Sequence, residues 1–199
     1  MPLPHAPWRL IQIEKRGETM ARMLCWFLLS ASLGASGCCS VPKYEPAFWN
    51  DAGIVQYNNN CYNYGNNKRT DSYAQPGRAA GAQYTAVICA EVQRAALADG
   101  LRAVPATGQC PSDSHNQYCK IAFAVGEIYP GQRDYHWYRQ DQGGMWSHKP
   151  GGGTARNVDH AGSPIADPQT ADRDGYTDFC GYLCTCSDSA QGNGHAKIN

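Results

Sequence analysis

Cys61, His136 and His148 have the residue types that a thiol nucleophile, its base and an orienting group require. Cys61 follows the asparagines at positions 58–60, in a polar run that leads into a short aromatic segment. An Asn side chain can accept the free N–H groups that open a helix, so we expect Cys61 in the first turn of a short helix over residues 57–67. The positive end of the helix dipole there favours thiolate over thiol.

The two histidines bracket a turn signal, Asp141-Gln142-Gly143-Gly144, between aromatic-rich runs at 135–140 and 145–149. A hairpin centred near Gln142 places His136 directly opposite His148. Directly opposed side chains share one face of the sheet, with Cβ atoms about 4.5–5.5 Å apart, so the two imidazoles can touch. A bulge at Gly143 or Gly144 shifts this register.

Other patterns predict the elements that must position these residues. An Ala-rich helix is expected over 84–99, and the alternation of Ile121, Phe123 and Val125 predicts a strand over 120–129. A second hairpin is expected over 158–165 and a last strand over 176–185. Helices followed by antiparallel strands are typical of an α+β domain.

The first 37 residues have the pattern of a secretory signal peptide. A basic residue, Arg22, precedes the apolar run 24–29, and small residues continue to Gly37. Met20 or Met23 is the more natural start, which makes residues 1–19 an upstream extension. The mature chain then forms one domain over 38–199.

Processing at Cys38 has two interpretations. The segment Ala35-Ser36-Gly37-Cys38 loosely resembles a bacterial lipobox, which predicts a lipid anchor on Cys38. Plain cleavage after Gly37 is the alternative, and the sequence leaves both open. In either case the protein is expected outside the cytoplasm, as a periplasmic, envelope-anchored or secreted protein.

The composition of the mature chain argues against several partners. From position 38 onward there are 13 Lys and Arg against 15 Asp and Glu, and no basic block of the kind that binds nucleic acid. No mature stretch is apolar enough to cross a membrane. We expect a monomer without a cofactor or a bound metal.

Cysteine usage predicts disulfides in an oxidising compartment. Cys110 and Cys119 flank a polar loop and are expected to close it. The C-terminal cluster Cys180, Cys184 and Cys186 is interpreted as disulfide-forming rather than metal-binding, because a second half of a metal site is absent from the sequence. Nine cysteines follow position 37, so a free Cys61 leaves eight for four bridges. If Cys38 carries a lipid as well, an odd number remains.

The order of Cys, His and a second His resembles the papain-like fold and, within it, the NlpC-type cell-wall peptidases. The resemblance implies a disulfide-stabilised α+β fold in which N-terminal helices pack on an antiparallel sheet. It implies that Cys61 is the nucleophile, His136 the base and His148 the orienting residue, with Gln56 or Tyr57 at the oxyanion hole. The chain has Asn-Cys-Tyr-Asn where these peptidases usually have Asp-Cys-Ser-Gly.

The implied function is an exported cysteine hydrolase, a peptidase or amidase acting on peptide or isopeptide bonds such as those of peptidoglycan. His136 would take the thiol proton, and the thiolate would attack the carbonyl. Acyl transfer to an amine is chemically as accessible as hydrolysis. Four aromatic residues are the expected substrate-binding side chains: Tyr62, Tyr64, Trp137 and Trp146.

A second resemblance supports a different class of function. The runs 134–140 and 146–151 look like a segment of insoluble matrix proteins described from mollusc shell. The alternative is therefore a non-catalytic, disulfide-rich exported domain that binds a polymer or a protein through the same aromatics and Tyr57. In that case Cys61 can be half of a disulfide with Cys89 or Cys39, and the two histidines can be packed strand residues.

Overall fold

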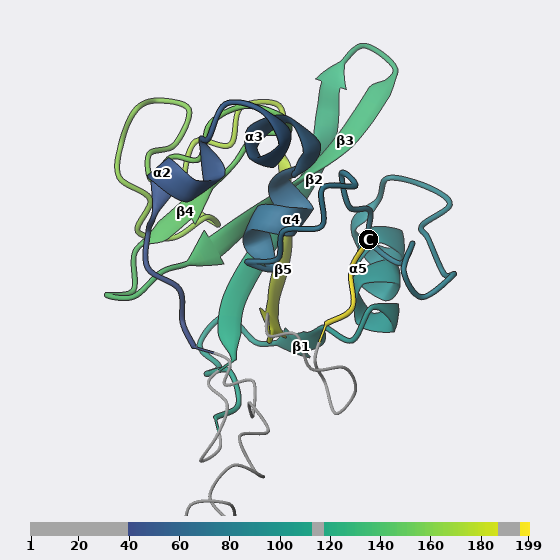
Figure 1. Cartoon of the computed structure of the whole chain (residues 1–199). Coiled ribbons are helices and arrows are strands. Elements are labelled where there is room, and N and C mark those ends of the chain that lie inside the picture. The colour runs from purple at the N-terminus through teal and green to yellow at the C-terminus, as the bar shows by residue number, and fades with distance from the viewer. Residues whose placement is uncertain (1–39, 113–117, 187–195) are drawn as a thin grey trace, which may run out of the picture. The chain divides into compact units, whose positions relative to one another are not determined.

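An antiparallel sheet forms the centre of the computed structural model, which describes residues 40–112, 118–186 and 196–199 (Figure 1). All the described residues fall in one compact unit. In chain order the elements are α2 (Pro46–Trp49), α3 (Ile54–Asn58), α4 (Cys61–Gly65), α5 (Cys89–Ala98), β1 (Arg102–Val104), β2 (Cys119–Tyr129), β3 (Gln132–Gln140), β4 (Trp146–His148) and β5 (Asp178–Thr185). Helices followed by an antiparallel sheet confirm the α+β class.

The strand order is β1-β5-β2-β3-β4, and every neighbouring pair is antiparallel. The long β2–β3 hairpin turns at Gly131, whose φ of +75° is a conformation that glycine adopts without strain. The sequence predicted strand 120–129 but not this hairpin, and it missed β1. Of the predicted 158–165 hairpin, one bridge between Val158 and Pro164 is present.

The sheet buries a different set of side chains on each face, because successive strand residues point to opposite sides. Ile121, Phe123 and Val125 of β2 share a core with Trp137 and with helix residues such as Val92. Helix α4 packs on β3, and α5 packs on β5. The intervening positions, Ala122, Tyr138, Trp146 and Tyr182, form a second core with Ile165 from the long loop before β5.

Helix α5 begins five residues later than predicted. Its N-cap, Ile88, is extended, with φ −130° and ψ 155°. The preceding Thr85, Val87 and Ile88 are β-branched and lose side-chain freedom in a helix, which favours the extended path. Cys89, the first helical residue, is also tied to β5 by a disulfide.

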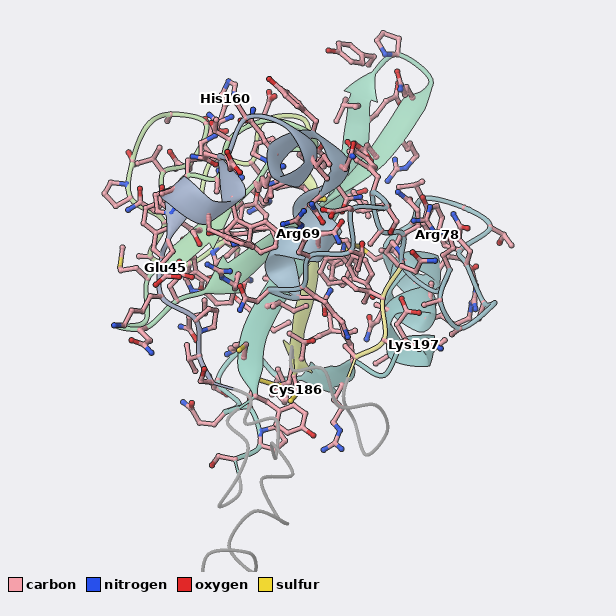
Figure 2. The ribbon with its side chains drawn as sticks, viewed as in Figure 1. Glu45, Arg69, Arg78, His160, Cys186 and Lys197 are labelled. Atoms are coloured by element: carbon pink, nitrogen blue, oxygen red, sulfur yellow. A yellow bond between two sulfur atoms is a disulfide. The ribbon has the colours of Figure 1, made fainter. Side chains whose placement is uncertain are left out.

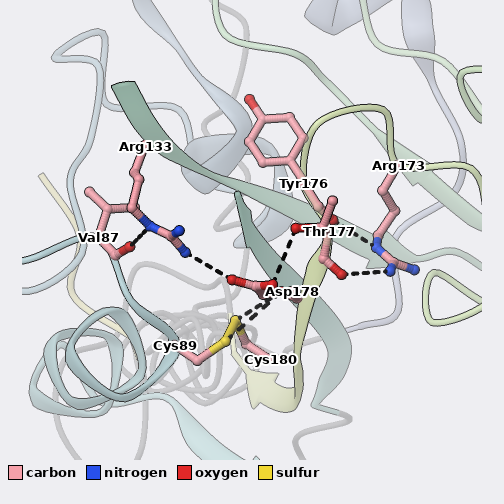
Figure 3. Close-up of a disulfide and its surroundings, with 8 residues drawn as sticks. All are labelled: Val87, Cys89, Arg133, Arg173, Tyr176, Thr177, Asp178 and Cys180. Carbon is pink, nitrogen blue, oxygen red and sulfur yellow. Dashed lines mark hydrogen bonds and ion pairs between the residues drawn. A yellow bond between two sulfur atoms is a disulfide. The ribbon is translucent and has the colours of Figure 1, made fainter. Parts of the chain in front are cut away.

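Disulfides join Cys89 to Cys180 and Cys110 to Cys184. The first links the start of α5 to β5, beside an ion pair between Arg133 and Asp178 (Figure 3). Cys186, which directly follows β5 and is labelled in Figure 2, is also disulfide-bonded.

The predicted Cys110–Cys119 bridge is wrong, because Cys119 is a free, buried thiol. Lys120, not Cys119, lies opposite Cys184 in the register of β2 and β5. Cys119 therefore points to the other face of the sheet from Cys184, the actual partner of Cys110.

The signal peptide over 1–37, the start at Met20 or Met23 and the lipid anchor at Cys38 lie outside the described residues and stay predictions. Within the described ranges, no helix is long and apolar enough to cross a membrane.

Candidate functional site

Asn60 caps helix α4 and places Cys61 at its first position, as the local sequence predicts. The Asn60 side chain accepts hydrogen bonds from the backbone N–H groups of Tyr62 and Asn63, at 3.0 and 3.1 Å. The Asn63 side chain in turn accepts the Asn60 N–H at 3.1 Å, which completes a reciprocal capping box.

The environment of the Cys61 thiol opposes ionisation. The side chain is buried, and Sγ donates a weak hydrogen bond to the Tyr135 carbonyl at 3.8 Å. Burial, and after it the nearby Asp134 carboxylate, raises the pKa of the Cys61 thiol to about 12. This direction is opposite to the lowered thiol pKa that the sequence predicts. Helix α4 has only five residues, so its dipole does not offset the loss of water.

His136 and His148 are in contact, but not in the predicted register. Tyr138, not His136, lies directly opposite His148, because the turn is centred one residue later, at Gly143. Gly143 and Gly144 have φ of +90° and +88°, which the three-residue connection requires. The residue opposite His148 is thus two positions away from the predicted one. Residues two apart on a strand share a face, so His136 and His148 still lie on the same face of the sheet, as diagonal neighbours.

The hydrogen bonds of the pair define both neutral tautomers. His148 Nε2 lies 2.9 Å from the Val158 carbonyl oxygen, which can only accept, so this nitrogen carries a proton. His148 Nδ1 is then an acceptor, and it receives the Nε2–H of His136 at 2.7 Å. In the neutral pair, His136 Nδ1 is left with a free lone pair.

Burial keeps both imidazoles neutral. It lowers the pKa of His136 well below its ordinary value, and the neighbouring His148 and Arg156 lower it further. Burial likewise lowers the pKa of His148 to about 4. A neutral His136 and a protonated Cys61 are not the thiolate–imidazolium pair of an activated cysteine.

Cys61 and His136 nevertheless border one small cavity of about 100 Å³. The proposed oxyanion residues do not border it: the Gln56 amide donates to the Gly152 carbonyl at 3.3 Å, and Tyr57 is exposed. The glutamine at the cavity is Gln75, whose Oε1 accepts two tyrosine hydroxyls. Gln75 opens the turn-forming segment Gln75-Pro76-Gly77, and only the tertiary fold brings it to the thiol.

The four predicted substrate-binding aromatics are core residues. Tyr62, Tyr64 and Trp137 have no exposed surface, and Trp146 is nearly as buried. Trp137 stacks on Phe123 with ring centroids 4.6 Å apart. The assignment of these rings to a binding rim is therefore wrong. Among the described residues, the exposed aromatic rings are Phe48, Tyr57, Tyr73 and Tyr129.

A larger groove, of about 460 Å³, is bordered by both histidines and shares His136 and Tyr176 with the thiol cavity. We call it the histidine groove and define it by His136, Tyr138, His148, Tyr129, Arg156 and Tyr176. His136, Tyr138 and His148 are the buried members of this set. Tyr129, near the tip of the β2–β3 hairpin, and Arg156 are exposed. Among the described residues, no group of three or more His, Cys, Asp or Glu side chains is placed to hold a metal ion.

Insoluble matrix shell protein 1 from Ruditapes philippinarum is 46% identical over 149 residues, which cover 75% of this chain and 93% of that protein. The chain belongs to the insoluble matrix shell protein 1 family. The match extends beyond the C-terminal half in which the sequence suggested it. No family model matches the chain, and no solved structure matches it. The papain-like arrangement of this shell matrix family member therefore stays a prediction.

Proposed function

We propose that this protein is a non-catalytic, disulfide-stabilised extracellular domain that binds a polymer or another protein of an insoluble matrix. The observation that carries the proposal is the 46% identity with insoluble matrix shell protein 1 over nearly the whole of that protein. The buried, protonated thiol of Cys61 supports it, because such a group is a poor nucleophile.

The disulfides support an extracellular location. Bridges such as Cys89–Cys180 and Cys110–Cys184 form and persist in oxidising compartments and are rare in the cytosol. They cross-link the sheet to α5 and to the loop after β1. A cross-linked domain of this kind suits a protein that stays in place outside the cell.

The exposed aromatic rings supply contact area for a matrix partner. Phe48, Tyr57, Tyr73 and Tyr129 are between 42% and 66% exposed. Tyrosine offers an apolar ring and a polar hydroxyl, a combination that suits surfaces which bind other molecules.

The exported, oxidised protein is expected to sediment with decalcified insoluble shell matrix from Ruditapes philippinarum. Cys61→Ser should sediment to the same extent, because the thiol has no role in the proposed binding. The measurement is the fraction of protein in the pellet at increasing amounts of matrix, with serum albumin as the control protein. Protein that stays in the supernatant at every amount would contradict the proposal.

The second candidate function is the thiol hydrolase of peptide or isopeptide bonds, including those of peptidoglycan. One observation favours it: Cys61 and His136 border the same cavity, and the free lone pair on His136 Nδ1 is a proton acceptor. In that mechanism Nδ1 takes the thiol proton, the sulfur attacks the carbonyl, and His136 returns the proton to the leaving amine. His148 would act as the orienting residue through its bond to Nε2.

Iodoacetamide at pH 6 separates the two candidates. A thiol with a pKa of about 12 has only about one thiolate in a million at pH 6, so Cys61 should remain unmodified for hours in the folded protein. Peptide mapping by mass spectrometry follows Cys61 separately from Cys119, the other buried thiol. Urea-unfolded protein at pH 8.5 is the control in which both react. Rapid labelling of native Cys61 at pH 6 that His136→Ala suppresses would favour the hydrolase.

A further inference from the structure

We propose that the histidine groove binds a sugar unit of a neutral polysaccharide. This inference rests on the proposed function, since it names the class of polymer and the place where the polymer binds.

The first observation is an unpartnered hydroxyl at the base of the groove. Tyr138 is 2% exposed, and its hydroxyl makes no hydrogen bond with any described residue. Two neighbouring rings hold the Tyr138 ring in place. It stacks on His148 with ring centroids 5.3 Å apart, and it makes an edge-to-face contact with His136 at a centroid distance of 4.9 Å. The hydroxyl is not among the fully buried unpaired atoms, so it keeps contact with the water of the groove, where a ligand hydroxyl can pair with it.

The second observation is a complementary acceptor on the same face of the sheet. His136 borders the groove, and its Nδ1 holds a lone pair that the neighbouring His148 does not use. A phenol and an imidazole nitrogen together can donate to and accept from a sugar hydroxyl, which is itself both donor and acceptor.

The charges around the groove balance. Arg156 and Arg173 border the groove together with Asp172 and Asp174, so the formal charges of its lining residues cancel. The Arg173 guanidinium is already committed to backbone carbonyls, including those of Pro168 and Gln169. Asp174 lies 3.8 Å from His160, whose side chain projects outward in Figure 2. A groove without net charge favours a neutral ligand over an anionic chain.

The lip of the groove provides a stacking surface. Tyr129, the most exposed of the large hydrophobic side chains at 66%, stands near the tip of the β2–β3 hairpin and borders the groove. The faces of sugar rings carry C–H groups that pack on aromatic rings, while the ring edges carry hydroxyls for polar partners. The volume of about 460 Å³ lies within the range of sites that enclose small ligands.

A peptide chain fits this place less well. Extended peptides often bind by adding a strand to a free sheet edge. The outer edge of β4, beside the groove, is taken by bridges from His148 to Arg156 and from Trp146 to Ile165. The polar groups that border the groove belong to Tyr, His, Arg and Asp side chains, all of which can hydrogen-bond to a hydroxyl. A ligand with several hydroxyls can therefore pair with them.

The test is isothermal titration calorimetry of the exported protein with cellohexaose and with the hexamer of N-acetylglucosamine, both neutral. Hexagalacturonate is the anionic probe of matched length. We expect binding of a neutral hexamer, weaker binding of the anionic one, and a loss of about tenfold in affinity for Tyr138→Phe. Tyr129→Ala should lose a similar factor through stacking.

Tyr44→Phe is the matched control, because it deletes a tyrosine hydroxyl that bonds to the Ala155 carbonyl outside the groove. It should leave the affinity unchanged. Equal affinities of Tyr138→Phe and the parent, a preference for hexagalacturonate, or no binding of any hexamer would overturn the inference. If the protein sediments with shell matrix but does not bind the neutral hexamers, this inference alone is refuted. Protein that does not sediment refutes the proposed function.

Discussion

Replacing Arg139 with methionine is expected to lower the free energy of unfolding by about 3–5 kcal/mol. Arg139 lies on β3 with no exposed surface, and its guanidinium donates to Asp141 at 2.8 Å and to Asn67 at 2.7 Å. It also lies over the Tyr64 ring, 4.2 Å from the centroid. Without the guanidinium, the buried Asp141 carboxylate retains Ser147 as its side-chain donor and loses its counter-charge.

Urea denaturation followed by tryptophan fluorescence measures this effect. Arg133→Met is the matched control on the same strand, because Arg133 pairs with Asp178 on the surface and such pairs contribute about 0–1 kcal/mol. Adding Asp141→Leu to Arg139→Met should recover part of the loss, since it removes the stranded charge. Similar losses for the Arg139 and Arg133 variants would show that the buried network does not stabilise the fold.

Local features of this site were predictable from sequence, because they depend on neighbouring residues alone. An asparagine directly before a helix commonly caps the free N–H groups of its first turn, and Asn60 does so for α4. The glycine-rich turn brings His136 and His148 to one face, and an error of one residue in the turn centre leaves that face unchanged. The strand over 120–129 follows from alternation, which is also a local pattern.

The features that decide function depend on distant segments, and the sequence could not supply them. The thiol pKa of Cys61 depends on burial beneath Tyr135 and on Asp134, both far along the chain. Composition cannot say whether an aromatic ring packs inside or stands on the surface: Tyr62 is buried, whereas Tyr57, five residues earlier, is exposed. Disulfide partners likewise depend on strand register, which places Lys120 rather than Cys119 opposite Cys184.

Acidification from pH 7 to pH 4 is expected to cost the folded protein about 3 kcal/mol through His148 alone. Its folded pKa is lowered to about 4, whereas an unfolded histidine titrates near its ordinary value of 6.5. Between about pH 6.5 and pH 4, His148 binds a proton in the unfolded chain but stays neutral in the folded chain. The free energy of unfolding therefore falls as the pH falls through this range. His136, whose pKa is lowered well below 6.5, adds to the loss in the same direction. A proton on His148 would go to Nδ1 and oppose the Nε2–H of His136 across the 2.7 Å contact, whereas His136 can take a proton on Nδ1 and keep this bond.

Urea denaturation at pH 7, 6, 5 and 4 measures this window, and His148→Asn isolates the contribution of the pair. The variant should be less stable than the parent at pH 7, because it loses packing and the bond to Val158, but its stability should fall less steeply towards pH 4. The comparison is needed because Asp99 and Asp141 have raised pKa values and favour the folded state in acid, which partly hides the histidine effect in the parent. His160→Asn is the matched control, because it replaces an exposed histidine outside the pair and should have little effect on stability at pH 7. If the stability of the His148 variant runs parallel to that of the parent at every pH, the pair is not held neutral by burial, and the main physical objection to a charged His136 beside Cys61 disappears.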